Sequence, residues 1–84
     1  MKIYGINGKK NIIGPRIKYI REKNNWTQSD LAAKLQIEDV IVEQKAISRM
    51  ELGLRLITDY ELLALALAKV LKVSAVWLLT GEND

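Results

Sequence analysis

The sequence predicts an all-α fold with five helices packed around one hydrophobic core. Its 84 residues suffice for one small domain and leave little mass for a second core. Apolar residues recur at helical spacing in successive segments, and Ser or Thr residues that cap helix N-termini stand before several of them. The alternating LALALA stretch could indicate a strand, but its length and its strong helix formers favour a helix.

Composition narrows the classes of function. The chain has no cysteine and no histidine, which excludes thiolate chemistry, disulfides, and the commonest catalytic base and metal ligand. We therefore expect no enzymatic activity, no catalytic residues, no metal and no cofactor. Thirteen basic residues against ten acidic ones give a net charge of +3, which permits a polyanionic partner. The longest apolar run is too short to cross a bilayer and no signal peptide is visible, so we expect a cytoplasmic protein without membrane contact.

The chain is expected to divide into an N-terminal arm, residues 1–12, and a folded domain, residues 13–84. Glycines, asparagines and lysines without a sustained period predict that the arm is flexible. The first helix is expected to begin near Gly14, because the proline that follows suits a first helical turn and isoleucines recur at helical spacing. It is expected to stop at the Asn24–Asn25 pair.

The second helix is expected to begin after Thr27. This residue and Asp30 resemble a capping box with Asp in place of Glu. Leucines and a small alanine, Ala32, then form the side that packs into the core. Trp26, just before the cap, is expected to staple the helix entry to the core rather than to stack on bases.

The third helix is expected to have two distinct sides. At 100° per residue, one arc is apolar and contains Ala46, Ile47, Met50 and Leu54. The opposite arc contains Gln44, Lys45, Ser48, Arg49 and Leu52. Apart from its leucine, this outer arc offers two cations, an amide and a hydroxyl without a carboxylate, and such groups suit base edges in the DNA major groove. An ordinary solvated face is the alternative interpretation.

Two further helices are expected near the C-terminus. Thr58 and Glu61 form a capping box that opens a helix over residues 58–72, which should be the most buried because leucine and alanine cover it almost all round. Ser74 is expected to cap a short helix with the sequence AVWLL, stopped by Gly81.

An ordered set of segments resembles the Cro/C1-type helix-turn-helix domains, the XRE family to which the lambda and 434 repressors belong. The segments are IGPRIKYIREKNNWTQSDLAAKL, AISRMELGLR and ALAKVLKVSAVWLLTG, and they extend from Ile13 to Gly81. The resemblance implies a compact five-helix, lambda-repressor-like domain that binds double-stranded DNA sequence-specifically. It implies a dimeric transcriptional regulator, a repressor, that reads a pseudo-palindromic operator with its third helix in the major groove.

The resemblance also implies roles for individual residues. Gln28, which opens the second helix, would grip a phosphate, and Ser48 would make a phosphate or water-mediated contact. Arg55, in the loop after the third helix, is expected to hold a phosphate as well. Arg21 and Glu51 match an ion pair that such domains form between the first and third helices. The residues that would meet bases are Gln44, Lys45 and Arg49.

The connection between the second and third helices departs from the family. Ala32 and Ile47 match a small residue and the branched residue packed beneath it, but they stand farther apart than in related domains, with no glycine between them. The most economical alignment makes QIEDV, residues 36–40, an insertion that either lengthens the second helix or forms a bulging turn. Val42 is then the buried turn residue and Glu43 the cap of the third helix.

The C-terminal helix supplies apolar residues for a homodimer. Related proteins dimerise through this region, which implies an interface made by Val76, Leu78 and Leu79, while Trp77 closes the core. Two other functions stay open. The chain could be the antitoxin of a toxin–antitoxin pair, with a toxin or an inducer as protein partner, or a helical protein-interaction module that does not bind DNA.

Overall fold

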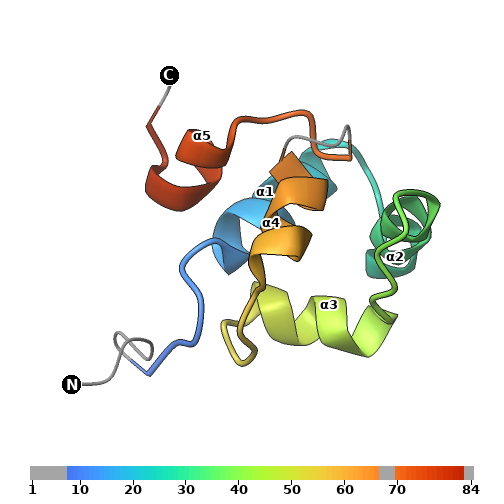
Figure 1. Cartoon of the computed structure of the whole chain (residues 1–84), viewed down its shortest axis with the longest axis horizontal. Coiled ribbons are helices and arrows are strands. Elements are labelled where there is room, and N and C mark those ends of the chain that lie inside the picture. The colour runs from blue at the N-terminus through green and yellow to red at the C-terminus, as the bar shows by residue number, and fades with distance from the viewer. Residues whose placement is uncertain (1–7, 67–69, 83–84) are drawn as a thin grey trace.

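The computed structural model describes residues 8–66 and 70–82, and five α-helices occupy most of this part of the chain. They are α1 (Gly14–Lys23), α2 (Gln28–Ile37), α3 (Gln44–Glu51), α4 (Asp59–Ala66) and α5 (Ala75–Thr80). The described residues contain no β-strand. In Figure 1, α3 runs along one edge of the molecule and α5 lies on the opposite side, with α1 and α4 between them. The predicted all-α fold with five helices is therefore confirmed.

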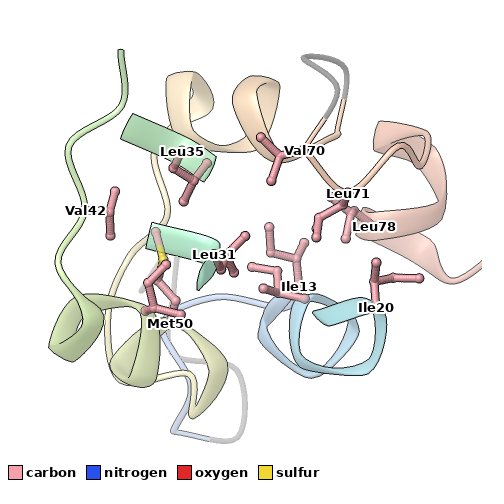
Figure 2. Packing of buried hydrophobic residues seen from close by; sticks show 11 residues of the cluster. Ile13, Ile20, Leu31, Leu35, Val42, Met50, Val70, Leu71 and Leu78 are labelled. Carbon is pink, nitrogen blue, oxygen red and sulfur yellow. The ribbon is translucent and has the colours of Figure 1, made fainter. Parts of the chain in front are cut away.

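The core is an apolar cluster to which most of the helices contribute (Figure 2). Its buried members are Ile13, Ile17, Ile20, Leu31, Leu35, Val42, Ile47, Met50, Val70, Leu71 and Leu78. Removal of this apolar surface from water is the main favourable contribution to folding. Trp26 and Trp77 pack against the cluster and are partly buried, as expected for residues that close the core.

Leu78 corrects the expected dimer interface. Its side chain is 0% exposed and belongs to the core, because α5 turns this residue toward α1 and the segment Val70–Leu71. A residue without exposed surface cannot contact a partner subunit. The other two members of the expected interface, Val76 and Leu79, are 48% and 40% exposed.

The first helix ends in a Schellman motif, in which two backbone N–H groups beyond the helix bond to carbonyls of its last turn. The N–H of Asn25 donates to the Glu22 carbonyl and that of Trp26 to the Arg21 carbonyl, each at 3.0 Å. Asn25 has a left-handed φ of 60°, which asparagine tolerates better than most residues. The stop predicted at Asn24–Asn25 is thus confirmed.

The insertion combines the two conformations that were expected as alternatives. Its first two residues lengthen α2 to Ile37, and Asp39 then reverses the chain with a φ of 63°. The N–H groups of Asp39 and Val40 donate to the carbonyls of Gln36 and Leu35, each at 3.0 Å, so a second Schellman motif ends this helix. Asp39 occupies the position where glycine is usual, which is why the sequence carried no clear signal for this stop.

The segment after this turn leads directly into α3. Val42 is 6% exposed and fills the expected buried turn position, whereas Ile41 is 75% exposed. Glu43 is the N-cap residue of α3, but its side chain makes no capping hydrogen bond. Glu43 thus occupies the predicted cap position, but its exposed carboxylate does not cap the helix.

The fourth helix is shorter than the predicted span of residues 58–72. It begins at Asp59 after the expected capping box, and its last described residue is Ala66. Val70 and Leu71 lie outside a helix with their side chains in the core, and Lys72 has a left-handed φ of 57°. The side chains of residues 63–69, including Lys69, lie outside the described part of the chain, as does the test of whether this helix is the most buried.

Candidate nucleic-acid interface

The two sides expected of α3 are present. Ile47 and Met50 are 0% and 1% exposed and anchor the helix in the core. On the other side, the side chains of Gln44, Lys45 and Arg49 are exposed, and Ser48 is half-buried. Leu54 does not belong to the buried side, because the helix ends at Glu51 and Gly53 turns the chain with a φ of 77° before residue 54. Leu54 is 45% exposed, and its predicted place in the core is wrong.

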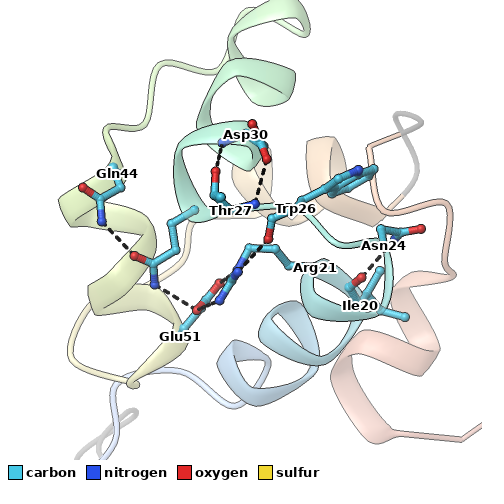
Figure 3. A network of polar contacts seen from close by, with 9 residues as sticks. Ile20, Arg21, Asn24, Trp26, Thr27, Asp30, Gln44 and Glu51 are labelled. Carbon is cyan, nitrogen blue, oxygen red and sulfur yellow. Dashed lines mark hydrogen bonds and ion pairs between the residues drawn. The ribbon is translucent and has the colours of Figure 1, made fainter.

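A buried ion pair joins α1 to α3. The Arg21 Nε donates to Glu51 Oε2 at 2.6 Å and Nη2 donates to Oε1 at 3.0 Å (Figure 3). The third guanidinium nitrogen, Nη1, donates to the Trp26 carbonyl at 2.8 Å, which fixes the turn that enters α2. The side chains of Arg21 and Glu51 are only 10% and 3% exposed. The hydrogen bond with Glu51 raises the pKa of Arg21 above its ordinary value, against the opposing effect of burial.

The ion pair is connected to the exposed face of α3 through two glutamines. The Gln28 Nε2 donates to Glu51 Oε1 at 3.0 Å, and the Gln44 Nε2 donates to Gln28 Oε1 at 2.9 Å. A carboxylate can only accept hydrogen bonds, so Gln28 must present its NH₂ group to Glu51 and its oxygen to Gln44. Gln44 must then present its own NH₂ group to Gln28. The charge of one buried carboxylate thus sets the orientation of an exposed amide on α3. The dashed lines in Figure 3 mark the hydrogen bonds that lead from Glu51 to Gln44.

The loop after α3 contains a second ion pair. The Arg55 Nη1 and Nη2 donate to the Oε1 and Oε2 atoms of Glu61 at 2.9 and 2.8 Å. Glu61 also accepts from the Thr58 N–H at 2.9 Å, so it caps α4 and pairs with Arg55 at once. From the sequence, Arg55 was expected to hold a phosphate. Its pairing with Glu61 was not predicted, because it depends on how the loop between them folds. Arg55 therefore anchors the loop that follows α3.

Acid is expected to weaken the fold through Glu61. Burial alone would raise its pKa, but hydrogen bonds from Arg55 and Thr58 outweigh burial and lower the pKa below its ordinary 4.5. A lowered pKa in the folded state stabilises the protein above pH 4.5, and this contribution is lost as the pH falls through the folded-state pKa. In urea titrations, the free energy of unfolding is expected to decline below this pH, and to decline less in Glu61→Gln. Equal declines in both proteins would contradict this assignment.

The α2–α3 unit has the arrangement of a helix-turn-helix motif. Two consecutive helices pack against each other, and the second presents a polar outer side. A family model described as a helix-turn-helix domain matches residues 14–84. The chain belongs to the helix-turn-helix domain family. None of the curated proteins compared with the chain matches it.

Helix-turn-helix domains bind DNA with the second helix of the motif in the major groove, so family membership indicates DNA as the partner. Here the second helix is α3. The connection of this helix-turn-helix domain, residues 38–43, is longer than the roughly three- to four-residue turn usual for the motif.

Over residues 8–66 and 70–82, no group of three potential metal ligands occurs, and no helix is both long and apolar enough to span a membrane.

Proposed function

We propose that this chain is a Cro/C1-type, sequence-specific DNA-binding protein that acts as a dimeric transcriptional repressor. In this proposal, α3 lies in the major groove and reads base edges through Gln44, Lys45 and Arg49. Phosphate contacts by Gln28, Ser48 and Arg55 set the orientation of the domain on the duplex. Binding requires no chemical step, so we propose no enzymatic activity.

The observation that carries the proposal is the orientation of the Gln44 amide. One of its N–H groups donates to Gln28, which leaves the second N–H and the oxygen of Gln44 free. A free amide N–H beside a free amide oxygen matches the N7 acceptor and the N6 amino group of adenine. Because Gln28 and Glu51 hold this amide in place, less side-chain entropy is lost when it meets a base.

Lys45 and Arg49 extend the same face. Both side chains are exposed, and Arg49 uses its Nη2 for a 3.2 Å hydrogen bond to the Leu54 carbonyl. A guanidinium has five N–H groups, so most of the Arg49 donors stay available for guanine O6 and N7. Gln28 keeps one N–H for a phosphate oxygen, and Arg55 keeps its Nε–H beside the pair with Glu61.

The proposed homodimer uses the exposed residues of α5. Val76 and Leu79 remain available, and Tyr19 of α1 is 58% exposed, with its ring centroid 6.3 Å from that of Trp77. Tyr19 and Trp77 thus bring exposed apolar surface of α1 next to α5, and the proposed interface uses it together with Val76 and Leu79. A two-fold dimer would place two α3 helices roughly 34 Å apart, one turn of DNA, and would require a pseudo-palindromic operator.

The test is an in vitro selection of duplexes with the wild-type chain and with Arg49→Ala. The wild type is expected to enrich a pseudo-palindrome, with affinity that falls steeply as salt rises. Arg49→Ala is expected to lose about 1–3 kcal/mol of binding free energy and its preference at one base pair in each half-site. Ser48→Ala is the matched comparison, since the loss of a proposed phosphate contact outside the Glu51–Gln28–Gln44 network should weaken binding to all duplexes alike. Unchanged affinity and preference in Arg49→Ala would contradict the assignment.

One observation favours a second candidate, a module that binds a protein partner such as a toxin. The insertion exposes two isoleucines, Ile37 at 78% and Ile41 at 75%, and such apolar surface is typical of protein contacts. Gel-shift titration against random DNA at two salt concentrations separates the candidates. A pure protein adaptor would show neither DNA binding nor a salt dependence.

A further inference from the structure

Three residues before α1 are attached to the end of α3, about forty positions away in sequence. Lys9 Nζ donates to the Leu52 carbonyl at 3.1 Å, and the Lys10 N–H donates to the Gly53 carbonyl at 2.8 Å. We call Lys9, Lys10 and Asn11 the N-terminal clamp. All three belong to the segment expected to be a flexible arm, so at least this part of it contacts the folded domain.

Asn11 is the centre of the clamp. Its Nδ2 donates to the Met50 carbonyl at 3.0 Å and to the Arg55 carbonyl at 2.9 Å, and its Oδ1 accepts from the Gly14 N–H at 2.8 Å. Both amide hydrogens are therefore used. Asn11 has no donor left for a phosphate or a base, so it acts on the polypeptide itself.

The acceptors of the clamp are the backbone groups that define where α3 ends. The Met50 carbonyl belongs to the last turn of the helix, and it also accepts from the Gly53 N–H at 3.1 Å. The Leu54 N–H donates to the Arg49 carbonyl at 2.8 Å, while the Arg49 side chain donates to the Leu54 carbonyl at 3.2 Å. The clamp bonds to the carbonyls of Gly53 and Arg55, on either side of Leu54. It therefore also fixes the Leu54 carbonyl, to which the Arg49 guanidinium donates.

We propose that Asn11 is a positioning residue that holds the C-terminal end of α3, and with it Arg49, in the orientation required for base recognition. The inference rests on the proposed DNA-binding function. It assigns a specificity role to a residue outside the helix-turn-helix motif that never touches DNA. Loss of the clamp leaves the phosphate contacts of Gln28 in place, and it relaxes the base contact of Arg49.

The substitution Asn11→Asp isolates the donor half of the clamp. The carboxylate still accepts from the Gly14 N–H, and its negative charge interacts favourably with the N-terminal end of the α1 dipole. It cannot donate a hydrogen bond, and its oxygens repel the carbonyls of Met50 and Arg55. Hydrogen exchange of the free protein is expected to accelerate about tenfold at Gly53 and Leu54, relative to amides of α2. With duplexes that differ at single base pairs, preference at the Arg49 position is expected to fall about tenfold, while affinity for non-operator DNA stays within about twofold.

Control variants distinguish a general loss of stability from a change in the orientation of Arg49. Ile20→Val truncates a core side chain that takes no part in the clamp, and it is expected to keep the wild-type preference when assayed fully folded. Asn11→Ser, which retains an acceptor but cannot span two carbonyls, replaces Asn11→Asp if the latter fails to fold. If hydrogen exchange at Gly53 and Leu54 is unchanged in Asn11→Asp, Asn11 does not hold the end of α3. If exchange accelerates but base preference stays as in the wild type, Asn11 has no role in specificity. If the wild type prefers no duplex, the proposed function fails, and the specificity role of Asn11 fails with it.

Discussion

Replacing Glu51 by glutamine is expected to lower the free energy of unfolding by about 3–5 kcal/mol. The Glu51 side chain is 3% exposed and balances the charge of Arg21, which is itself 10% exposed. Glutamine keeps the shape of the side chain but leaves the guanidinium charge buried without a counter-charge. Small domains are stable by about 5–15 kcal/mol, so this loss is a large share of the total. Urea denaturation monitored by circular dichroism measures it.

The same substitution is expected to disturb base recognition in the fraction that stays folded. A glutamine at position 51 can turn either its oxygen or its NH₂ group toward Gln28, so the orientation of the Gln44 amide is no longer imposed. Glu22→Gln, which removes an exposed carboxylate from α1, is the matched control and is expected to change stability by less than about 0.5 kcal/mol. Equal stabilities of Glu51→Gln and Glu22→Gln would contradict the structural role given to the pair.

Replacing Gly14 by alanine is expected to destabilise the fold by about 3 kcal/mol. A Cβ atom at this position would lie 2.2 Å from the Met50 carbonyl oxygen and 3.0 Å from that of Glu51. Both contacts are with backbone, so α1 and the end of α3 would have to move apart. Thermal unfolding monitored by circular dichroism measures the loss.

The sign of this effect is diagnostic. At an exposed helical site, alanine is favoured over glycine by about 1 kcal/mol, so helix propensity alone predicts that Gly14→Ala stabilises the chain. Lys18→Ala, at an exposed position of the same helix, is the control and is expected to shift stability by less than about 0.5 kcal/mol. A Gly14→Ala protein as stable as the wild type would show that α1 and α3 are not in close contact.

Helices with local start and stop signals could be predicted from the sequence. Capping residues marked the starts of α2, α4 and α5, and the Asn24–Asn25 pair marked the end of α1, since both kinds of signal act within a few residues. The end of α2 could not be located from the sequence, because Asp39 adopts the left-handed conformation that glycine usually marks. The end of α4 was missed because its leucine-rich pattern continues to Val70 and Leu71, which pack in the core without being helical.

The sequence predicted which residues lie on the outer side of α3, but not the hydrogen bonds that connect them to the rest of the fold. Helical periodicity placed Gln44 and Arg49 outward, because it depends on one segment alone. The hydrogen bonds from Glu51 through Gln28 to Gln44 depend on how α2 and α3 cross, which periodicity does not specify. The hydrogen bond between Asn11 and the Gly14 N–H could have been predicted weakly, because an asparagine just before a helix often accepts from its first N–H groups. Its bonds to the carbonyls of Met50 and Arg55 became apparent only in the fold.

An NMR titration of the labelled chain with its selected duplex tests whether the outer side of α3 contacts base edges. We expect the largest chemical-shift changes at the α3 backbone amides and at the side-chain NH₂ groups of Gln28 and Gln44. Changes centred on Ile37 and Ile41, with α3 and both glutamine side chains unaffected, would contradict it.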